Sequence, residues 1–351
     1  MARASSAAPW PRPSKLNRNP YKGAPPALQS RWSPSRRPYL ANVRATIRPE
    51  HVSQTGKHCA VDRERSRRGS CRKARFCRPI RYNRGMSEHP SVVIVTGSGG
   101  SGCGRAIAAR FAADQAAVVV SDINEAGGHE TVRLIEQRGG RVAFCRADVR
   151  DELEVRHLIE FAESTFGGLS VLVNNASSPH PAGEGMAGWI PSLQTDLLGT
   201  LCATRYAIEA MRRLGGGSIV NISSISALWH GRKTAGGFPG YDVAKLGVIR
   251  LTTWVAKDAA NDGIRVNCLA PGWIATDGPR QYWESLTPVQ RAERGVPSKL
   301  LSTKEIADVV VRLATDRSLN GRVVVWWSED LPRLIEWGDR GYRNVAELSL
   351  S

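Results

Sequence analysis

The sequence predicts an α/β fold: a mostly parallel, seven-stranded sheet with helices on both faces. Short apolar runs, many of them β-branched, alternate with longer stretches of helical apolar spacing. Uninterrupted apolar runs are typical of parallel strands buried on both faces, and such strands need crossover helices. The predicted strands are residues 92–95, 118–120, 142–145, 171–173, 218–222, 265–269 and 323–326. The predicted helices are residues 105–113, 127–138, 152–165, 190–214, 241–261 and 304–315.

The basic charge of the 351-residue chain lies in its first quarter. Residues 1–85 hold 21 lysines and arginines and three acidic residues. The whole chain carries a net charge of +17, so residues 86–351 are close to neutral. Their length fits one α/β domain with a large core. We therefore predict a basic extension over residues 1–85 and a single domain over residues 86–351.

The extension is rich in Arg, Pro and Ser and shows no sustained apolar periodicity, so we expect it to be disordered. It fits an organelle transit peptide or a nucleic-acid-binding arm. A zinc site is disfavoured because its cysteines form no CxxC pair. The simplest interpretation is that translation starts at Met86, which leads directly into the first predicted strand. We favour that interpretation and expect no nucleic-acid partner.

Cysteine usage and hydropathy indicate the compartment. The seven cysteines are an odd number without the spacing of a disulfide framework, which favours a reducing environment. No apolar run reaches the roughly 18 residues of a membrane span, and the N-terminus lacks the apolar stretch of a signal peptide. We therefore predict a cytoplasmic protein without membrane contact and without a metal site.

A glycine-rich turn at residues 97–104 separates the first predicted strand from the first predicted helix. Glycines permit a tight turn and let backbone N–H groups and a helix N-terminus approach a diphosphate. Asp122 ends the second predicted strand, where a carboxylate can bind both ribose hydroxyls of NAD and repel the 2′-phosphate of NADP. Alternatively, Asp122 caps the next helix. The pattern predicts a dinucleotide site that prefers NAD to NADP.

This stretch resembles the short-chain dehydrogenase/reductase family, whose turn reads Thr-Gly-x-x-x-Gly-x-Gly. Gly97, Gly102 and Gly104 match that pattern with one additional residue inside the turn. The resemblance covers about residues 91–326. It implies a Rossmann-like, doubly wound sheet that binds NAD(P).

Further family motifs follow the other strands in the expected order. Asp148 stands where the family contacts the adenine edge. The Asn-Asn-Ala motif at 174–176 is followed by Ser177 in place of the family's glycine, and residues 271–276 stand where the family holds the nicotinamide carboxamide. The cofactor-binding residues implied by the resemblance are Gly97, Ser101, Gly102, Cys103, Asp122, Ile123, Asp148, Val149, Asn175, Ala176, Tyr241, Lys245, Pro271, Gly272, Ile274 and Thr276.

Tyr241 and Lys245 follow the fifth predicted strand at a spacing that puts them on one helical face. A free tyrosine, with a pKa of about 10, is a poor base at neutral pH. A nearby ammonium and a cationic nicotinamide favour the phenolate form. The pair therefore predicts a general acid/base, the role that the family resemblance also implies.

The resemblance implies two further catalytic residues. Ser224 ends the fifth predicted strand and matches the family serine that bonds the substrate oxygen. Alternatively, its hydroxyl caps its own backbone. Asp196 aligns with a family Asn that kinks the long middle helix and whose backbone carbonyl holds a lysine-bound water. We expect Asp196 to keep the kink, add a charge near Lys245 and support the same proton relay less directly.

Together these residues predict reversible hydride transfer between NAD(H) and a secondary alcohol or ketone. Aromatic side chains in residues 178–189, 227–240 and 273–300 favour an apolar or ring-bearing substrate, although such side chains also serve simple packing. Three basic residues could instead attract an acidic substrate, namely Arg232, Lys233 and Arg280.

The resemblance also implies a homodimer or homotetramer, formed through the helices predicted at 190–214 and 241–261. Two other functions compete with the enzyme. A non-catalytic NAD-binding sensor or scaffold on the same fold would have a broken Tyr–Lys pair. A nucleic-acid-binding protein would act through residues 1–85 with a steep salt dependence.

Overall fold

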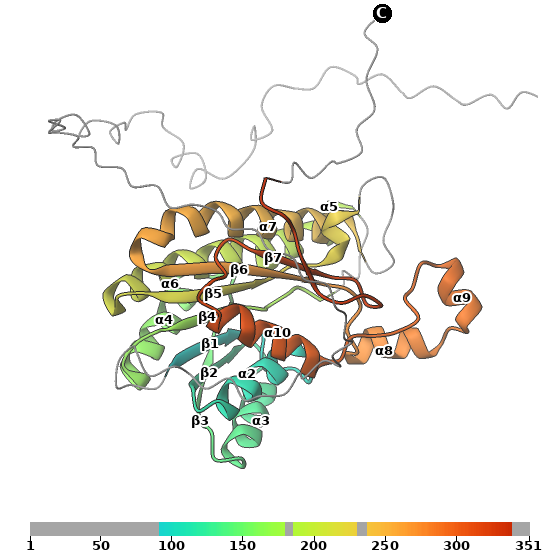
Figure 1. The fold of residues 1–351 in the computed structure, drawn as a ribbon. Helices are drawn as coiled ribbons and strands as arrows, with labels where there is room; N and C mark the ends of the chain where they lie inside the picture. The colour runs from blue at the N-terminus through green and yellow to red at the C-terminus, as the bar shows by residue number, and fades with distance from the viewer. Residues whose placement is uncertain (1–90, 180–184, 230–236, 339–351) are drawn as a thin grey trace, which may run out of the picture. The chain divides into compact units, whose positions relative to one another are not determined.

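The computed structural model describes residues 91–338, except 180–184 and 230–236. The extension predicted at 1–85 lies outside the described residues, as do Arg232 and Lys233. Within them, the strands form one sheet in the order β3-β2-β1-β4-β5-β6-β7-β8 (Figure 1). Its strands are β1 (Val92–Thr96), β2 (Ala117–Asp122), β3 (Arg141–Arg146), β4 (Val171–Asn174), β5 (Gly217–Ile222), β6 (Ile264–Pro271), β7 (Val323–Trp326) and β8 (Arg333–Leu334).

The predicted parallel, doubly wound sheet is confirmed, with one strand more than expected. The first seven strands pair in parallel. β8 pairs antiparallel with β7 through Val324–Leu334 and Val325–Arg333. Two residues are too short a run to show an alternating pattern, so the sequence did not indicate this strand.

The predicted helices are present, and two more follow β6. The α-helices are α2 (Cys103–Ala113), α3 (Glu125–Glu136), α4 (Glu152–Phe166), α5 (Met186–Ser192), α6 (Thr200–Leu214), α7 (Pro239–Ala259), α8 (Asp277–Glu284), α9 (Pro288–Glu293) and α10 (Thr303–Thr315). Two 3₁₀ turns, η2 (Ile225–Leu228) and η3 (Ala260–Asp262), precede and follow α7. Neither α8 nor α9 buries a residue, so they lack the apolar stripe that identifies a core helix.

One predicted helix is interrupted. The stretch expected as a single helix over 190–214 consists of α5, the π-helical segment η1 (Leu193–Gly199) and α6. Pro191 inside α5 has no N–H to donate, which weakens the regular α-helical ladder here. Asp196 lies inside η1, and its backbone carbonyl accepts a hydrogen bond from the Thr200 hydroxyl at 2.8 Å. Irregular turns of this kind are frequent at functional sites.

Two large apolar clusters lie on opposite faces of the sheet, and a smaller third cluster joins residues of α7, β6 and β7. Successive residues of β1 face opposite clusters, as the period of two in a strand requires. Helices α2, α3 and α10 cover one face, and α4, α6 and α7 cover the other. Because the first seven strands are parallel, their carboxyl ends meet at one edge of the sheet, where ligands bind in this architecture.

Candidate active site

The glycine turn after β1 packs its backbone too closely for side chains. Gly97 has φ +67°, and a Cβ added to Gly104 would lie 2.1 Å from the Gly97 carbonyl oxygen. Gly102 is the N-cap of α2 and has no side chain that could cap the helix. Uncapped N–H groups at a helix N-terminus suit an anion. The turn therefore fits a dinucleotide diphosphate.

The additional residue in this turn is accommodated by contacts with Asp122 of β2, Arg105 of α2 and Gly127 of α3. The Gly99 N–H donates to Asp122 Oδ2 at 2.8 Å, and the Arg105 guanidinium donates to the Gly99 carbonyl at 3.1 Å. A Cβ on Gly127, in the first turn of α3, would lie 2.1 Å from that same carbonyl. Glycine at 99 and 127 thus lets the longer turn rest against α3.

Asp122 is bound to the backbone on both of its carboxylate oxygens. Besides the Gly99 N–H, it accepts the Asn124 N–H on Oδ1 at 2.9 Å. The N-cap of α3 is Asn124, whose side chain accepts the Gly127 N–H at 3.0 Å. The alternative that Asp122 caps this helix is therefore wrong. The neighbouring Ile123 is exposed at the surface.

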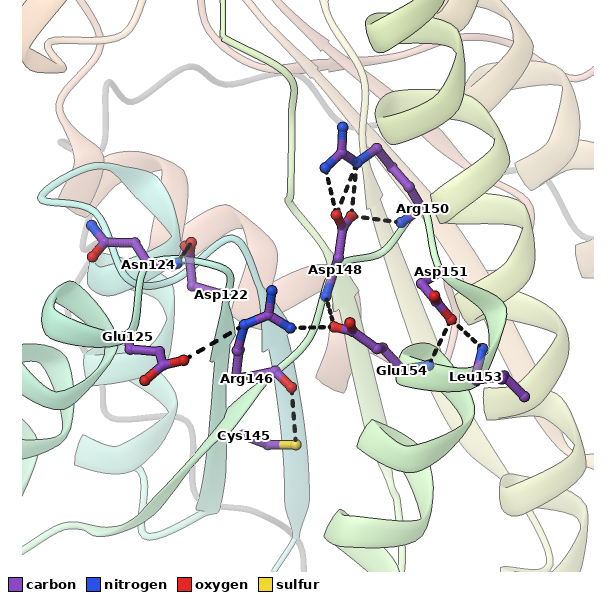
Figure 2. A network of polar contacts seen from close by, with 10 residues as sticks. All are labelled: Asp122, Asn124, Glu125, Cys145, Arg146, Asp148, Arg150, Asp151, Leu153 and Glu154. Carbon is purple, nitrogen blue, oxygen red and sulfur yellow. Dashed lines mark hydrogen bonds and ion pairs between the residues drawn. The ribbon is translucent and has the colours of Figure 1, made fainter.

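The ends of β2 and β3 carry a network of exposed ion pairs, which Figure 2 shows. Arg146 lies 2.7 Å from Glu154 and 3.6 Å from Glu125. The Arg150 guanidinium binds both oxygens of Asp148 and lowers the pKa of that carboxyl. Asp148 thus follows the carboxyl end of β3, and its carboxylate is held by Arg150, two residues further along the chain.

The predicted contacts at the ends of β3 and β4 include structural roles. Val149 is buried and packs against Gly199 of η1. The Thr96 hydroxyl accepts the N–H groups of Asn175 and Ala176, each at 3.1 Å. The Asn175 side chain donates to the carbonyls of Thr96 and Gly97, each at 2.9 Å. Asn175 therefore fastens the glycine turn to β4.

The segment after β6 meets the glycine turn from the other side. The Thr276 methyl group lies 3.3 Å from the position of a Cβ on Gly102, and the Ser101 hydroxyl donates to Asp277 at 2.6 Å. The Gly272 N–H donates to the Trp326 carbonyl at 2.7 Å. These contacts bring the predicted residues of both segments together.

Three predicted cofactor residues remain, namely Cys103, Pro271 and Ile274. Burial raises the pKa of the Cys103 thiol to about 12, so it is neutral at physiological pH. Pro271 ends β6, and Ile274 forms a bridge with Leu301. Ser328, which the sequence did not indicate, accepts the N–H of the residue after Gly272 at 2.9 Å.

Tyr241 and Lys245 lie together in the first turns of α7. The Lys245 ammonium is 5.4 Å from the centre of the Tyr241 ring, and that ring stacks on Phe238 at 5.7 Å. Lys245 is buried and donates to the Ile222 carbonyl, at the end of β5, at 3.1 Å. The predicted pair is therefore in contact at the carboxyl edge of the sheet.

Asp196 binds Lys245 directly. Its Oδ1 lies 2.8 Å from the ammonium, and both side chains are buried. Burial opposes the charge on Lys245, but the carboxylate of Asp196 and the phenol of Tyr241 outweigh it, so the Lys245 pKa is raised. The charge expected near Lys245 is thus present and forms an ion pair with it.

Two serines that the sequence did not assign also bind this carboxylate, one at each oxygen. The Ser177 hydroxyl donates to Asp196 Oδ1 at 2.5 Å, and the Ser178 N–H donates to Oδ2 at 3.1 Å. Ser177 replaces the family's glycine and Asp196 replaces the family's asparagine. The two departures from the family pattern are therefore hydrogen-bonded partners, a relation that only the fold reveals.

Comparisons with known proteins decide the family. A family profile described as enoyl-(acyl carrier protein) reductase matches residues 98–325. Cis-4-hydroxycyclohexanecarboxylate dehydrogenase from Sinomonas cyclohexanicum is 34% identical over 229 residues, which is 64% of this chain and 89% of that protein. The chain belongs to the short-chain dehydrogenase/reductase family.

Other members agree with this assignment. Cyclohexanol dehydrogenase from Acinetobacter sp. (strain SE19) is 33% identical over 233 residues, 64% of this chain and 88% of that protein. The structure of 7α-hydroxysteroid dehydrogenase with NADH and 7-oxo glycochenodeoxycholic acid superposes with a TM-score of 0.60 at 29% identity, covering 68% of this chain and 93% of that one. The chain is thus an NAD(P)-dependent dehydrogenase that acts on CH–OH groups.

In the dehydrogenase, Ser224 follows β5 and is the N-cap of η2. It precedes η2, which packs against α7, and its hydroxyl accepts the Ser226 N–H at 3.2 Å. The backbone cap considered from the sequence is therefore present. A hydroxyl that accepts one bond still carries a proton to donate, so the cap is compatible with substrate binding. The preceding Ser223 donates to the Lys245 carbonyl at 2.7 Å.

Aromatic rings gather in the segments of the dehydrogenase beyond the strand ends. Trp229 meets Trp327 edge-on at 5.5 Å, and Trp273 stacks on Tyr282 at 6.0 Å. Arg280 donates to the Ala275 carbonyl, a bond within its own segment.

The described residues, 91–338 without 180–184 and 230–236, contain no cluster of three or more histidine, cysteine or acidic side chains able to hold a metal ion. They also contain no helix with the length and hydropathy needed to cross a bilayer.

Proposed function

We propose that the dehydrogenase catalyses reversible hydride transfer between NAD(H) and the carbinol carbon of a cyclic secondary alcohol, with Tyr241 as general acid/base. The observation that carries this proposal is the contact between Tyr241 and the buried ammonium of Lys245. A non-catalytic sensor on the same fold predicts a broken pair, and this pair is intact.

The residues around the glycine turn are assigned to the cofactor. Backbone N–H groups of the turn and of the first turn of α2 would hold the diphosphate, and Asp122 would hold the adenosine ribose. Pro271 and the residues after it, through Thr276, would hold the carboxamide end. When bound, NAD supplies the carbon that accepts or donates the hydride.

The chain's own residues handle the substrate oxygen and its proton. Ser224 and Tyr241 donate hydrogen bonds to that oxygen and fix its position. Tyr241 takes the proton during oxidation and returns it during reduction. Lys245 holds the nicotinamide ribose and favours the phenolate through its charge, and Asp196 supports the relay by binding Lys245.

The charges near the ribose site favour NAD over NADP. The Asp122 carboxylate would repel a 2′-phosphate, and residues 97–104 carry no charged side chain that could bind one. The first cation after the turn in the sequence, Arg105, donates to the Gly99 carbonyl at 3.1 Å and to the Thr131 hydroxyl at 2.9 Å.

A six-membered carbocyclic alcohol is the substrate class with the best support. Two relatives are dehydrogenases of cyclohexanol and of cis-4-hydroxycyclohexanecarboxylate. The ring pairs Trp229–Trp327 and Trp273–Tyr282 supply apolar faces suited to a saturated ring.

A homodimer or homotetramer is proposed from the exposed apolar side chains on η1, α6 and α7. Exposed apolar groups that lie together mark an interaction surface. The exposed side chains that would form this surface are Leu198, Leu201, Val243, Leu246 and Trp254.

The test is the reduction of NAD and of NADP by the full chain with cyclohexanol, 4-hydroxycyclohexanecarboxylate and an acyclic secondary alcohol. We expect NADH to form with a cyclic alcohol and much less NADPH to form. Activity confined to NADP would contradict the role of Asp122. No activity with any alcohol would contradict the proposed reaction.

A further inference from the structure

The Asp196 carboxylate is a buried anion whose position depends on a few contacts. Lys245 and Ser177 share Oδ1, while the Ser178 N–H binds Oδ2. A buried charge persists only where hydrogen bonds and an opposite charge replace its hydration. The two donors from the loop after β4 therefore help to hold this carboxylate against Lys245.

The groups facing Lys245 come from four elements. Asp196 faces it from η1, Tyr241 from its own helix α7, the Ile222 carbonyl from β5 and Cys268 from β6. Burial raises the pKa of the Cys268 thiol to about 12, so that group is neutral at physiological pH. Asp196 is therefore the carboxylate that pairs with Lys245 among these groups.

We propose that Ser177 is a positioning residue whose hydroxyl, together with the Ser178 N–H, holds Asp196 against Lys245, so that an ion pair rather than a lone ammonium stands beside Tyr241. The pH dependence of turnover then depends on Ser177. The link to turnover rests on the proposed function of Tyr241, whereas the link between Ser177 and Lys245 does not.

The sign of the effect follows from charge. A lone ammonium favours the phenolate more strongly than an ammonium whose charge is compensated by a carboxylate. Asp196→Asn removes the compensation, so the acidic limb of the oxidation profile moves to lower pH. It also removes the carboxylate that opposes the burial of Lys245, so the Lys245 pKa falls.

Ser177→Ala removes one hydrogen-bond donor from this carboxylate. It should lower the Lys245 pKa and move the acidic limb of the oxidation profile to lower pH, in each case by less than Asp196→Asn. Ser177 is exposed, so its truncation leaves no cavity in the core. Ser178→Ala is the matched control, because the Ser178 hydroxyl donates to the Pro179 carbonyl while its backbone N–H binds Asp196. Ser177→Thr keeps the hydroxyl and should restore wild-type behaviour.

Two readouts on the full chain test the proposal. One is the NMR titration of the Lys245 side-chain nitrogen, assigned by its loss in Lys245→Met, and the other is the pH profile of alcohol oxidation. We expect the Lys245 titration to fall by about 1–3 pH units in Asp196→Asn and by less in Ser177→Ala. Ser178→Ala and Ser177→Thr should match the wild type, and Ser177→Ala should add nothing in the Asp196→Asn background.

Several results would overturn the proposal. A wild-type titration of Lys245 in Ser177→Ala would do so, as would independent addition of the effects of Ser177→Ala and Asp196→Asn. A uniform loss of kcat at every pH, without movement of the profile, would indicate a merely structural role. If the wild type oxidises no alcohol, the proposed function fails, and the Lys245 titration still decides the role of Ser177.

Discussion

The two ends of the candidate site use ion pairs in opposite environments. Where η1 meets α7, the Lys245–Asp196 pair has side-chain exposures of 4% and 0%. Where β2 and β3 end, the Arg150–Asp148 pair has exposures of 48% and 19% (Figure 2). Charges interact strongly in a dry interior and weakly beside water. We therefore expect the buried pair to control stability and chemistry, and the exposed pair to contribute little to either.

The largest difference between the two ends is expected from Lys245→Met. This change leaves the Asp196 carboxylate buried without its cation, and breaking a buried pair in this way costs about 3–5 kcal/mol. Urea denaturation should show a correspondingly lower free energy of unfolding. Arg156→Met, which breaks an exposed pair with Glu160, is the control and should unfold close to the wild type. Equal free energies of unfolding for the two variants would contradict the role of the buried pair in stability.

The nucleotide end should instead be sensitive to added volume. Gly104→Ala places a methyl group 2.1 Å from the Gly97 carbonyl oxygen and 2.7 Å from the Asn175 amide. Overpacking of this kind costs about 1–3 kcal/mol and displaces the turn. We expect weaker NADH binding by fluorescence titration. Gly278→Ala, where no other atom lies within 4 Å, should bind like the wild type. Unchanged binding by Gly104→Ala would mean that the turn does not seat the cofactor.

The smallest effect is expected from Arg150→Ala, which should lower the free energy of unfolding by less than about 1 kcal/mol near neutral pH. Hydrogen bonding to Arg150 lowers the Asp148 pKa below its ordinary 3.8. A lowered carboxyl pKa stabilises the fold above the ordinary value, and this contribution is lost as the pH falls through the folded value. The unfolding curves of wild type and Arg150→Ala should therefore converge in acid. A difference between the two free energies of unfolding that grows in acid would contradict this prediction.

Much of the fold could be predicted because the buried strands contain short runs of apolar residues, such as residues 92–95 and 118–120. The break at η1 was expected only as the kink that the family resemblance implies at Asp196, because the apolar spacing of residues 190–214 alone predicts one helix. The helices α8 and α9 bury no residue, so no apolar stripe marks them.

The Tyr241–Lys245 contact was predictable from spacing along one helix. The Asp196–Lys245 pair was expected only as a nearby charge, and the sequence gives no distance between η1 and α7. Ser177 was visible as a departure from a family motif, but its partner lies 19 residues further along the chain. Only the carboxyl edge of the sheet brings these residues together.

The central claim is that the Tyr241 phenol moves the proton of the substrate oxygen. Tyr241→Phe removes that hydroxyl and keeps the ring that stacks on Phe238. The measurement is alcohol-dependent NADH formation alongside NADH binding. We predict unchanged NADH binding and turnover lower by about 10²–10⁴-fold. Turnover at the wild-type rate with NADH still bound would contradict the account.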